Sequence, residues 1–151
     1  MKIRIVSAAA AALMLTTLAA LPHSGAAGVV KQRMDMMEAI SVGMKAVAGM
    51  IRGIEPFDAG RASAAASAIA DHARNIPRMF PEGSIAGPSE ASAEIWDDWE
   101  RFIKLSRRMQ MEALSLAETA AAAEDSAILR PQFHELGQTC IACHEAFRKN
   151  R

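Results

Sequence analysis

The sequence predicts an all-α fold, an antiparallel up-down four-helix bundle. Apolar residues recur along the chain at spacings of three and four, which is the period of an amphipathic helix. Runs of β-branched residues are nearly absent, and alanine-rich stretches such as ASAAASAIA and AETAAAA have high helix propensity. Segments containing proline and glycine divide the pattern into four helices. Short connections between them make neighbouring helices antiparallel.

The first 27 residues are predicted to be a cleaved export signal. Lys2 and Arg4 precede an apolar run over residues 8–21, and small residues follow Pro22 up to a cleavage position near residue 27. The apolar run is shorter than the ~20 residues that a membrane-spanning helix needs. We therefore expect residues 28–151 to form the mature domain.

The charge of the mature chain bears on its partners. The full sequence has 17 basic and 17 acidic residues, and removal of Lys2 and Arg4 leaves 15 basic residues and a net charge of −2. A nearly neutral chain gives no sign of the basic patch that binds nucleic acid or an anionic membrane. No later segment is apolar enough to span a membrane. We expect one soluble domain in the periplasm, without a nucleic-acid partner.

The first helix is predicted over Val29–Arg52, ending before Gly53 and Pro56. Its inward face carries apolar residues in a 3-4-3-4 pattern that only Arg33 interrupts. The residues of this face are Val30, Arg33, Met37, Ile40, Met44, Val47, Ile51 and Ile54.

The other three helices follow from similar signals. The second begins after Asp58, a suitable N-cap, and ends at Pro77. A loop with the sequence FPEGSIAGPSEAS leads to a third helix over residues 91–122. The fourth begins after Asp125 or Ser126, with Pro131 in a position where a first-turn proline costs little.

The strongest chemical signal is the sequence CIACH, with Cys140, Cys143 and His144 on one face of the fourth helix. A disulfide between residues three apart on a helix would be strained and would stabilise little. A thioredoxin-like redox pair needs a strand before the helix, and a structural zinc site needs a fourth ligand. C-x-x-C-H is the attachment signature of one covalent haem c, in which the histidine is an axial iron ligand.

The position of this motif at the C-terminus of a helical bundle resembles the class II cytochromes c, the cytochrome c′ and cytochrome c-556 family. The matching elements are RMDMM in the first helix, IRGIEPFD and IPRMFPEGS at helix ends, EIWDDWERF at the start of the third helix, and CIACHEAFRKN at the end. The MFPEGS segment is closer to the low-spin cytochrome c-556 branch. The resemblance covers the whole mature chain and implies a four-helix bundle with haem near the C-terminal helix.

The resemblance also implies roles for residues outside the motif. Met37, four residues after Arg33, takes the position opposite the histidine, where a thioether binds the iron of cytochromes c-556. The alternative for Met37 is core packing. Arg33 is implied to bind a haem propionate, or else it extends to solvent at the bundle end. Arg148, in the family's CHxxxR ending, lies beside the proximal imidazole or at a solvated helix end.

Together these expectations predict a periplasmic electron carrier. Its haem iron cycles between Fe(III) and Fe(II), with His144 and Met37 as axial ligands. The alternative is a five-coordinate, high-spin cytochrome c′ that binds nitric oxide or carbon monoxide. An enzyme is not expected, because no nucleophile–base pair or second metal motif accompanies CIACH. The expected partners are periplasmic redox proteins, and the sequence leaves a homodimer open.

Overall fold

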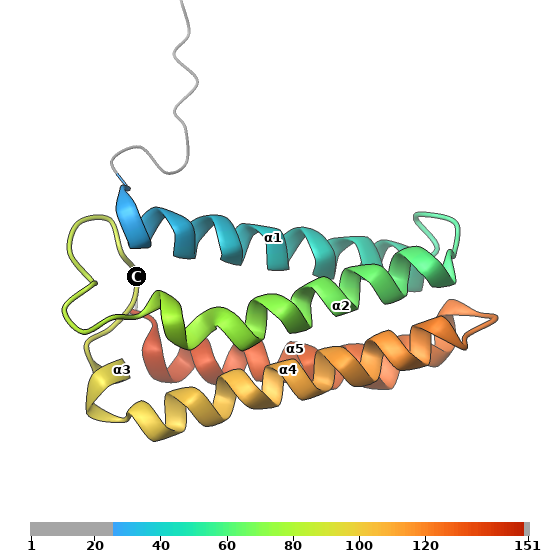
Figure 1. Ribbon diagram of the computed structural model, residues 1–151. Helices are drawn as coiled ribbons and strands as arrows, with labels where there is room; N and C mark the ends of the chain where they lie inside the picture. The colour runs from blue at the N-terminus through green and yellow to red at the C-terminus, as the bar shows by residue number, and fades with distance from the viewer. Residues whose placement is uncertain (1–25, 150–151) are drawn as a thin grey trace, which may run out of the picture.

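The computed structural model describes residues 26–149, so nearly all of the predicted signal peptide lies outside the described residues. Its helices, shown in Figure 1, are α1 (Gly28–Ile51), α2 (Ala59–Asn75), α3 (Glu94–Asp97), α4 (Trp99–Ala121) and α5 (Arg130–Phe147), with 3-10 turns η1 (Ile76–Met79) and η2 (Ser126–Leu129). Within this part of the chain, the only pairing of β type is an isolated bridge between Ala91 and Arg148. The predicted all-α class is confirmed.

The four long helices lie side by side in a bundle (Figure 1). Helix α1 packs on α2, α2 on α4, and α4 on α5, whereas the backbones of α1 and α5 approach each other closely at few points. Helix α1 begins at the end of the bundle where α5 finishes (Figure 1). The first turns of α1 therefore lie at the same end of the molecule as the last turns of α5.

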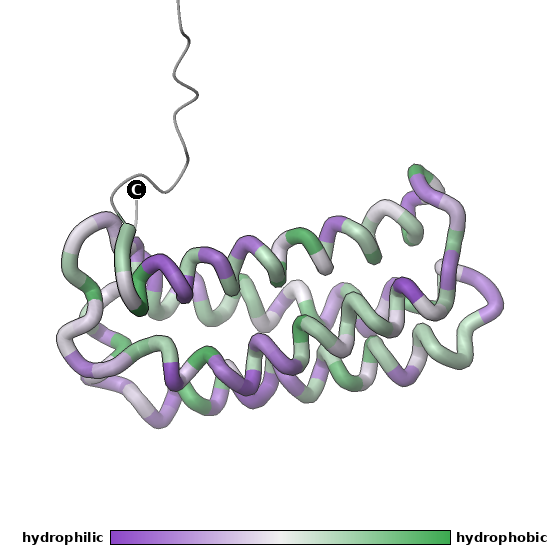
Figure 2. Tube along the Cα trace, turned by 45° about the horizontal axis from the view of Figure 1, so that its top comes forward, coloured by the Kyte–Doolittle hydropathy of each residue, from purple (hydrophilic) through white to green (hydrophobic). Residues whose placement is uncertain are grey.

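The core is formed by one apolar stripe from each long helix, and hydrophobic and hydrophilic residues alternate along each helix in Figure 2. The small residues of α2 allow close packing against α4. One buried hydroxyl joins these two helices, because the Oγ atom of Ser106 donates a hydrogen bond of 2.7 Å to the carbonyl of Ala73. The fully buried large side chains are Phe102, Met50, Ile69, Ile95, Leu116, Leu129, Leu136 and Val47.

Two helix starts agree with the sequence. The carboxylate of Asp58 accepts a hydrogen bond of 2.9 Å from the amide of Arg61 and caps α2. Asp125 caps η2 by accepting from the amide of Ala127 at 2.7 Å. Pro131 then lies in the first turn of α5, where its missing amide leaves no hydrogen bond unmade.

Two details of the prediction are wrong. Ile54 was expected on the inward face of the first helix, but it is 70% exposed, since α1 ends at Ile51 and Gly53 turns the chain with a φ of 69°. The third helix was expected to be continuous, but it is divided at Asp98, whose φ of −128° and ψ of 55° are not helical. The Asp98 carboxylate accepts from the amide of Arg101, so this residue caps a new helix instead of continuing the old one.

None of the helices in the described part of the chain is both long enough and apolar enough to cross a membrane.

Candidate functional site

The C-x-x-C-H motif occupies the last two turns of α5. Cys140 and Cys143 are both free thiols, both half-buried, and both packed against the edge of the hydrophobic core. The sulfur of Cys140 lies 3.6 Å from the carbonyl oxygen of Leu136 in the preceding turn. His144 follows on the same side of the helix and is exposed. Two thiols and an imidazole thus line one strip of α5.

The surroundings of the motif favour the uncharged form of each of its groups. Burial raises the pKa of the Cys140 thiol, and burial together with the neighbouring Cys140 raises the pKa of Cys143 to about 11. Partial burial lowers the pKa of His144, and the positive charge of Arg148 lowers it further, whereas Glu90 opposes the shift. A neutral imidazole has a free lone pair, which is the form that binds metal.

Arg33, in the second turn of α1, is 5% exposed. Its Nη2 atom donates a hydrogen bond of 2.5 Å to the carbonyl of Ser84, and its guanidinium carbon lies 4.2 Å from the centre of the Phe80 ring. The Nε and Nη1 atoms are buried and have no hydrogen-bond partner. A buried cation with two unpaired donors fits an anionic acceptor that belongs to a bound group.

Met36 and Met37, three and four residues after Arg33, differ in burial from what the sequence predicted. Met36 was not among the residues expected on the inward face, but it is 8% exposed and belongs to the core. Met37 is half-buried and packs against the edge of the core, as Cys140 and Cys143 do. The reason is geometric, because Arg33, Met36 and Ile40 form one stripe and Met37 lies on its flank.

Gly137 lies on the same face of α5 as Cys140 and His144, which are three and seven residues further on. A Cβ atom added to this glycine would meet no other atom within 4 Å. The surface of α5 is therefore open at Gly137. Open space of this kind suits the close approach of a flat cofactor.

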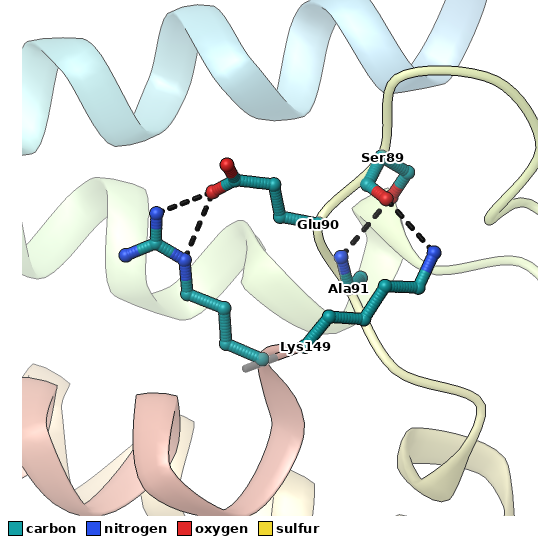
Figure 3. Close-up of polar contacts among 5 residues, drawn as sticks. Ser89, Glu90, Ala91 and Lys149 are labelled. Carbon is teal, nitrogen blue, oxygen red and sulfur yellow. Dashed lines mark hydrogen bonds and ion pairs between the residues drawn. The ribbon is translucent and has the colours of Figure 1, made fainter. Parts of the chain in front are cut away.

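The segment 89–92 is bound to the end of the chain just after the motif (Figure 3). The amide of Ser92 donates to the carbonyl of Phe147 at 2.9 Å, and the amide of Lys149 donates to the carbonyl of Glu90 at 2.8 Å. The Nζ atom of Lys149 donates to the carbonyl of Ser89 at 3.0 Å, as Figure 3 shows. The loop before α3 thus closes against the last turn of α5.

The side chain of Arg148 lies outside the helix, at its C-cap, and pairs with the carboxylate of Glu90. Its positive charge lowers the pKa of His144, and the side chain itself is exposed at the end of α5. Sequence reasoning missed Glu90 and Ser84 as neighbours of the site. Their only signal was the length of the loop, since a loop of this size is uncommon unless it has a function.

Comparison with known proteins decides the family. The model of the family "Cytochrome C'" matches residues 28–148. The chain belongs to the cytochrome c′ family. It is 36% identical to cytochrome c′ from Rhodospirillum rubrum, over 98% of this chain and 99% of that protein. It is 33% identical to cytochrome c-556 from Agrobacterium tumefaciens, over 81% of this chain and 98% of that protein. The structure of cytochrome c′ from Rhodopseudomonas palustris is similar, with a TM-score of 0.75 and 27% identity over 83% of this chain and 99% of that chain.

Cytochromes of this family bind one covalent haem c and are electron carriers or gas binders rather than classical enzymes. The site described above fits that cofactor. Two half-buried thiols and a neutral imidazole lie on one strip of α5, an unpaired buried cation lies on α1, and the face of α5 is open at Gly137. When bound, haem supplies reversible one-electron chemistry at its iron.

Proposed function

We propose that this protein is a periplasmic electron carrier with one haem c. Cys140 and Cys143 form the thioether bonds, His144 is the proximal iron ligand, and Met37 is the distal ligand. The observation that carries the proposal is the placement of the His144 imidazole beside two half-buried free thiols on one strip of α5. Residues 1–27 act as the cleaved signal for export.

The chain's own residues provide what an electron carrier needs. The packed core of the bundle holds α1 and α5 in place, so that ligands on the two helices keep the same positions in both oxidation states. A site that changes little between the two states has a small reorganisation energy, and electron transfer is then fast. A methionine thioether opposite the histidine also raises the reduction potential.

One observation favours the second candidate, a five-coordinate cytochrome that binds nitric oxide or carbon monoxide. Met37 lies on the flank of the buried stripe of α1, whereas Met36 fills the core. A flanking methionine has more freedom to move, and a side chain that only packs over the iron leaves a sixth position for a gas. The two candidates differ in one bond, from Met37 sulfur to iron.

The test is the visible spectrum of the purified holoprotein, oxidised and reduced, with and without carbon monoxide. Sharp separated bands after reduction, a sulfur-to-iron charge-transfer band when oxidised and no response to carbon monoxide would support Met37 ligation and electron transfer. A broad high-spin spectrum that changes with carbon monoxide would contradict Met37 ligation and favour gas binding.

The partners in this proposal are periplasmic redox proteins and a second copy of the chain. A shallow, open groove lies between α1 and α2, and its lining combines small residues such as Ala39, Gly43 and Ala65 with charged residues such as Asp35 and Arg61. Val42 is 60% exposed in this groove, where a second copy would cover it. Sedimentation of the holoprotein and of Val42→Glu tests this interface. We expect dimers from the native chain and monomers from the variant, and a native monomer would contradict it.

A further inference from the structure

The guanidinium of Arg33 is fixed in place before any ligand is considered. The ring of Phe80 lies 4.2 Å from its central carbon, and the carbonyl of Ser84 accepts a hydrogen bond from Nη2. Burial lowers the pKa of this arginine, but a guanidinium still keeps its proton at neutral pH. Arg33 therefore carries a buried positive charge whose position is fixed by Phe80 and Ser84.

Ser84 contributes a second unpaired donor at the same place. Its Oγ atom is buried and makes no hydrogen bond within residues 26–149, as is also true of Nε and Nη1 of Arg33. The carbonyl of the same serine is the atom that Arg33 already binds, so the hydroxyl and the guanidinium are close neighbours. A buried hydroxyl without a partner destabilises the fold, so an acceptor is expected there.

The loop that carries Ser84 is held at both ends. The amide of Ser84 donates to the carbonyl of Pro81 at 3.1 Å, and Gly83 completes this turn with a φ of 75°. Further along, Glu90 and Ser92 are bound to the end of α5 through backbone hydrogen bonds. The hydroxyl is consequently positioned by the fold and does not depend on a freely moving loop.

We propose that the Ser84 hydroxyl donates a hydrogen bond to the haem propionate that Arg33 binds, so that the turn Pro81–Ser84 closes over this carboxylate. The inference rests on the proposed function, because it requires the haem on α5. A carboxylate has two oxygens and several acceptor sites, so it can accept from a guanidinium and a hydroxyl together. One bound propionate would accept from the Ser84 hydroxyl and from one side of the Arg33 guanidinium.

The test compares holoproteins carrying Ser84→Ala, Ser84→Thr and Ser92→Ala. The Oγ atom of Ser92, in the same loop, already accepts from the amide of Glu94 and serves as the matched control. The readouts are the propionate bending band in the resonance Raman spectrum and the reduction potential. In Ser84→Ala we expect the band to shift and the potential to fall, because a less neutralised carboxylate favours ferric iron. Ser84→Thr should restore both, and Ser92→Ala should change neither.

An unchanged propionate band and potential in Ser84→Ala would overturn the inference, as would an equal shift in Ser92→Ala. These results are separate from those of the proposed function. A high-spin native spectrum would contradict Met37 ligation without affecting the propionate band. A native chain whose mass after denaturation shows no added haem would overturn the proposed function and this inference together.

Discussion

The carboxylate of Glu90 accepts two hydrogen bonds from the guanidinium of Arg148, four residues after His144. The two charges act on His144 in opposite directions, since Arg148 lowers its pKa and Glu90 raises it. The pair connects the loop before α3 with the end of the haem motif. It therefore offers a way to test electrostatic control of the site from outside the iron ligands.

The first prediction concerns this ion pair. Glu90→Gln removes a negative charge near the haem and should raise the reduction potential, whereas Arg148→Gln removes a positive charge and should lower it. Each shift should be on the order of tens of millivolts, because the pair is partly exposed and screened. Voltammetry of the three holoproteins measures this. The free energy of unfolding should change by about 0–1 kcal/mol. Shifts of the same sign would contradict the assignment.

The second prediction separates the two methionines of α1. Met37→Ala should convert the spectrum to high spin, because it removes the proposed sulfur ligand. Met36→Ala should keep the native spectrum but lower the free energy of unfolding by about 2–5 kcal/mol, because it leaves a cavity in the core.

Absorption spectra and denaturant titrations of the purified variants measure both effects. Met36→Leu, which nearly keeps the volume, serves as the control and should cost less than about 1.5 kcal/mol. A spectrum that changes with Met36 and not with Met37 would mean that the methionine next to the predicted one binds the iron.

The third prediction concerns the hydroxyl that joins α2 and α4. Ser106 is 4% exposed, and its Oγ atom donates to the carbonyl of Ala73. Ser106→Ala should lower the free energy of unfolding by about 0.5–1.5 kcal/mol and Tm by a few degrees. The exposed Ser115→Ala on the same helix should instead raise the free energy of unfolding slightly, by about 0.5 kcal/mol, because alanine is the better helix former. Calorimetry that finds no difference between the two variants would show that this buried hydrogen bond has no net effect.

The fold could be read from the sequence because each helix combines an apolar period with a local start or stop. Asp58 and Asp125 act as the caps that were expected, since capping depends only on the adjacent backbone. Asp98 shows the opposite case. Helix propensity favoured continuation through this residue, and the competing cap hydrogen bond to Arg101 divided the helix.

The haem motif could also be recognised from the sequence, because its chemistry depends on a spacing within one helix. The surroundings of Arg33 could not be predicted from the sequence, since Phe80 and Ser84 contact it from a segment about fifty residues away. Nothing in the spacing of either segment encodes that contact. The burial of Met36 in place of Met37 was missed for a related reason. The stripe that a helix buries is set by its neighbours, and a difference of one residue rotates it by about 100°.

The fourth prediction uses Gly137 to locate the cofactor. If no haem covered this face of α5, Gly137→Ala would stabilise the protein by about 0.8–1 kcal/mol. Alanine is the better helix former, and the added Cβ would lie more than 4 Å from the surrounding side chains. If the haem lies against this face of α5, as proposed, the methyl group instead collides with the macrocycle. We then expect a lower Tm of the holoprotein and a lower yield of attached haem. The exposed neighbour Gln138 calibrates the propensity effect, since Gln138→Gly should cost a similar amount without touching the site. A variant Gly137→Ala with a higher Tm and an unchanged spectrum would place the haem away from this face of the helix.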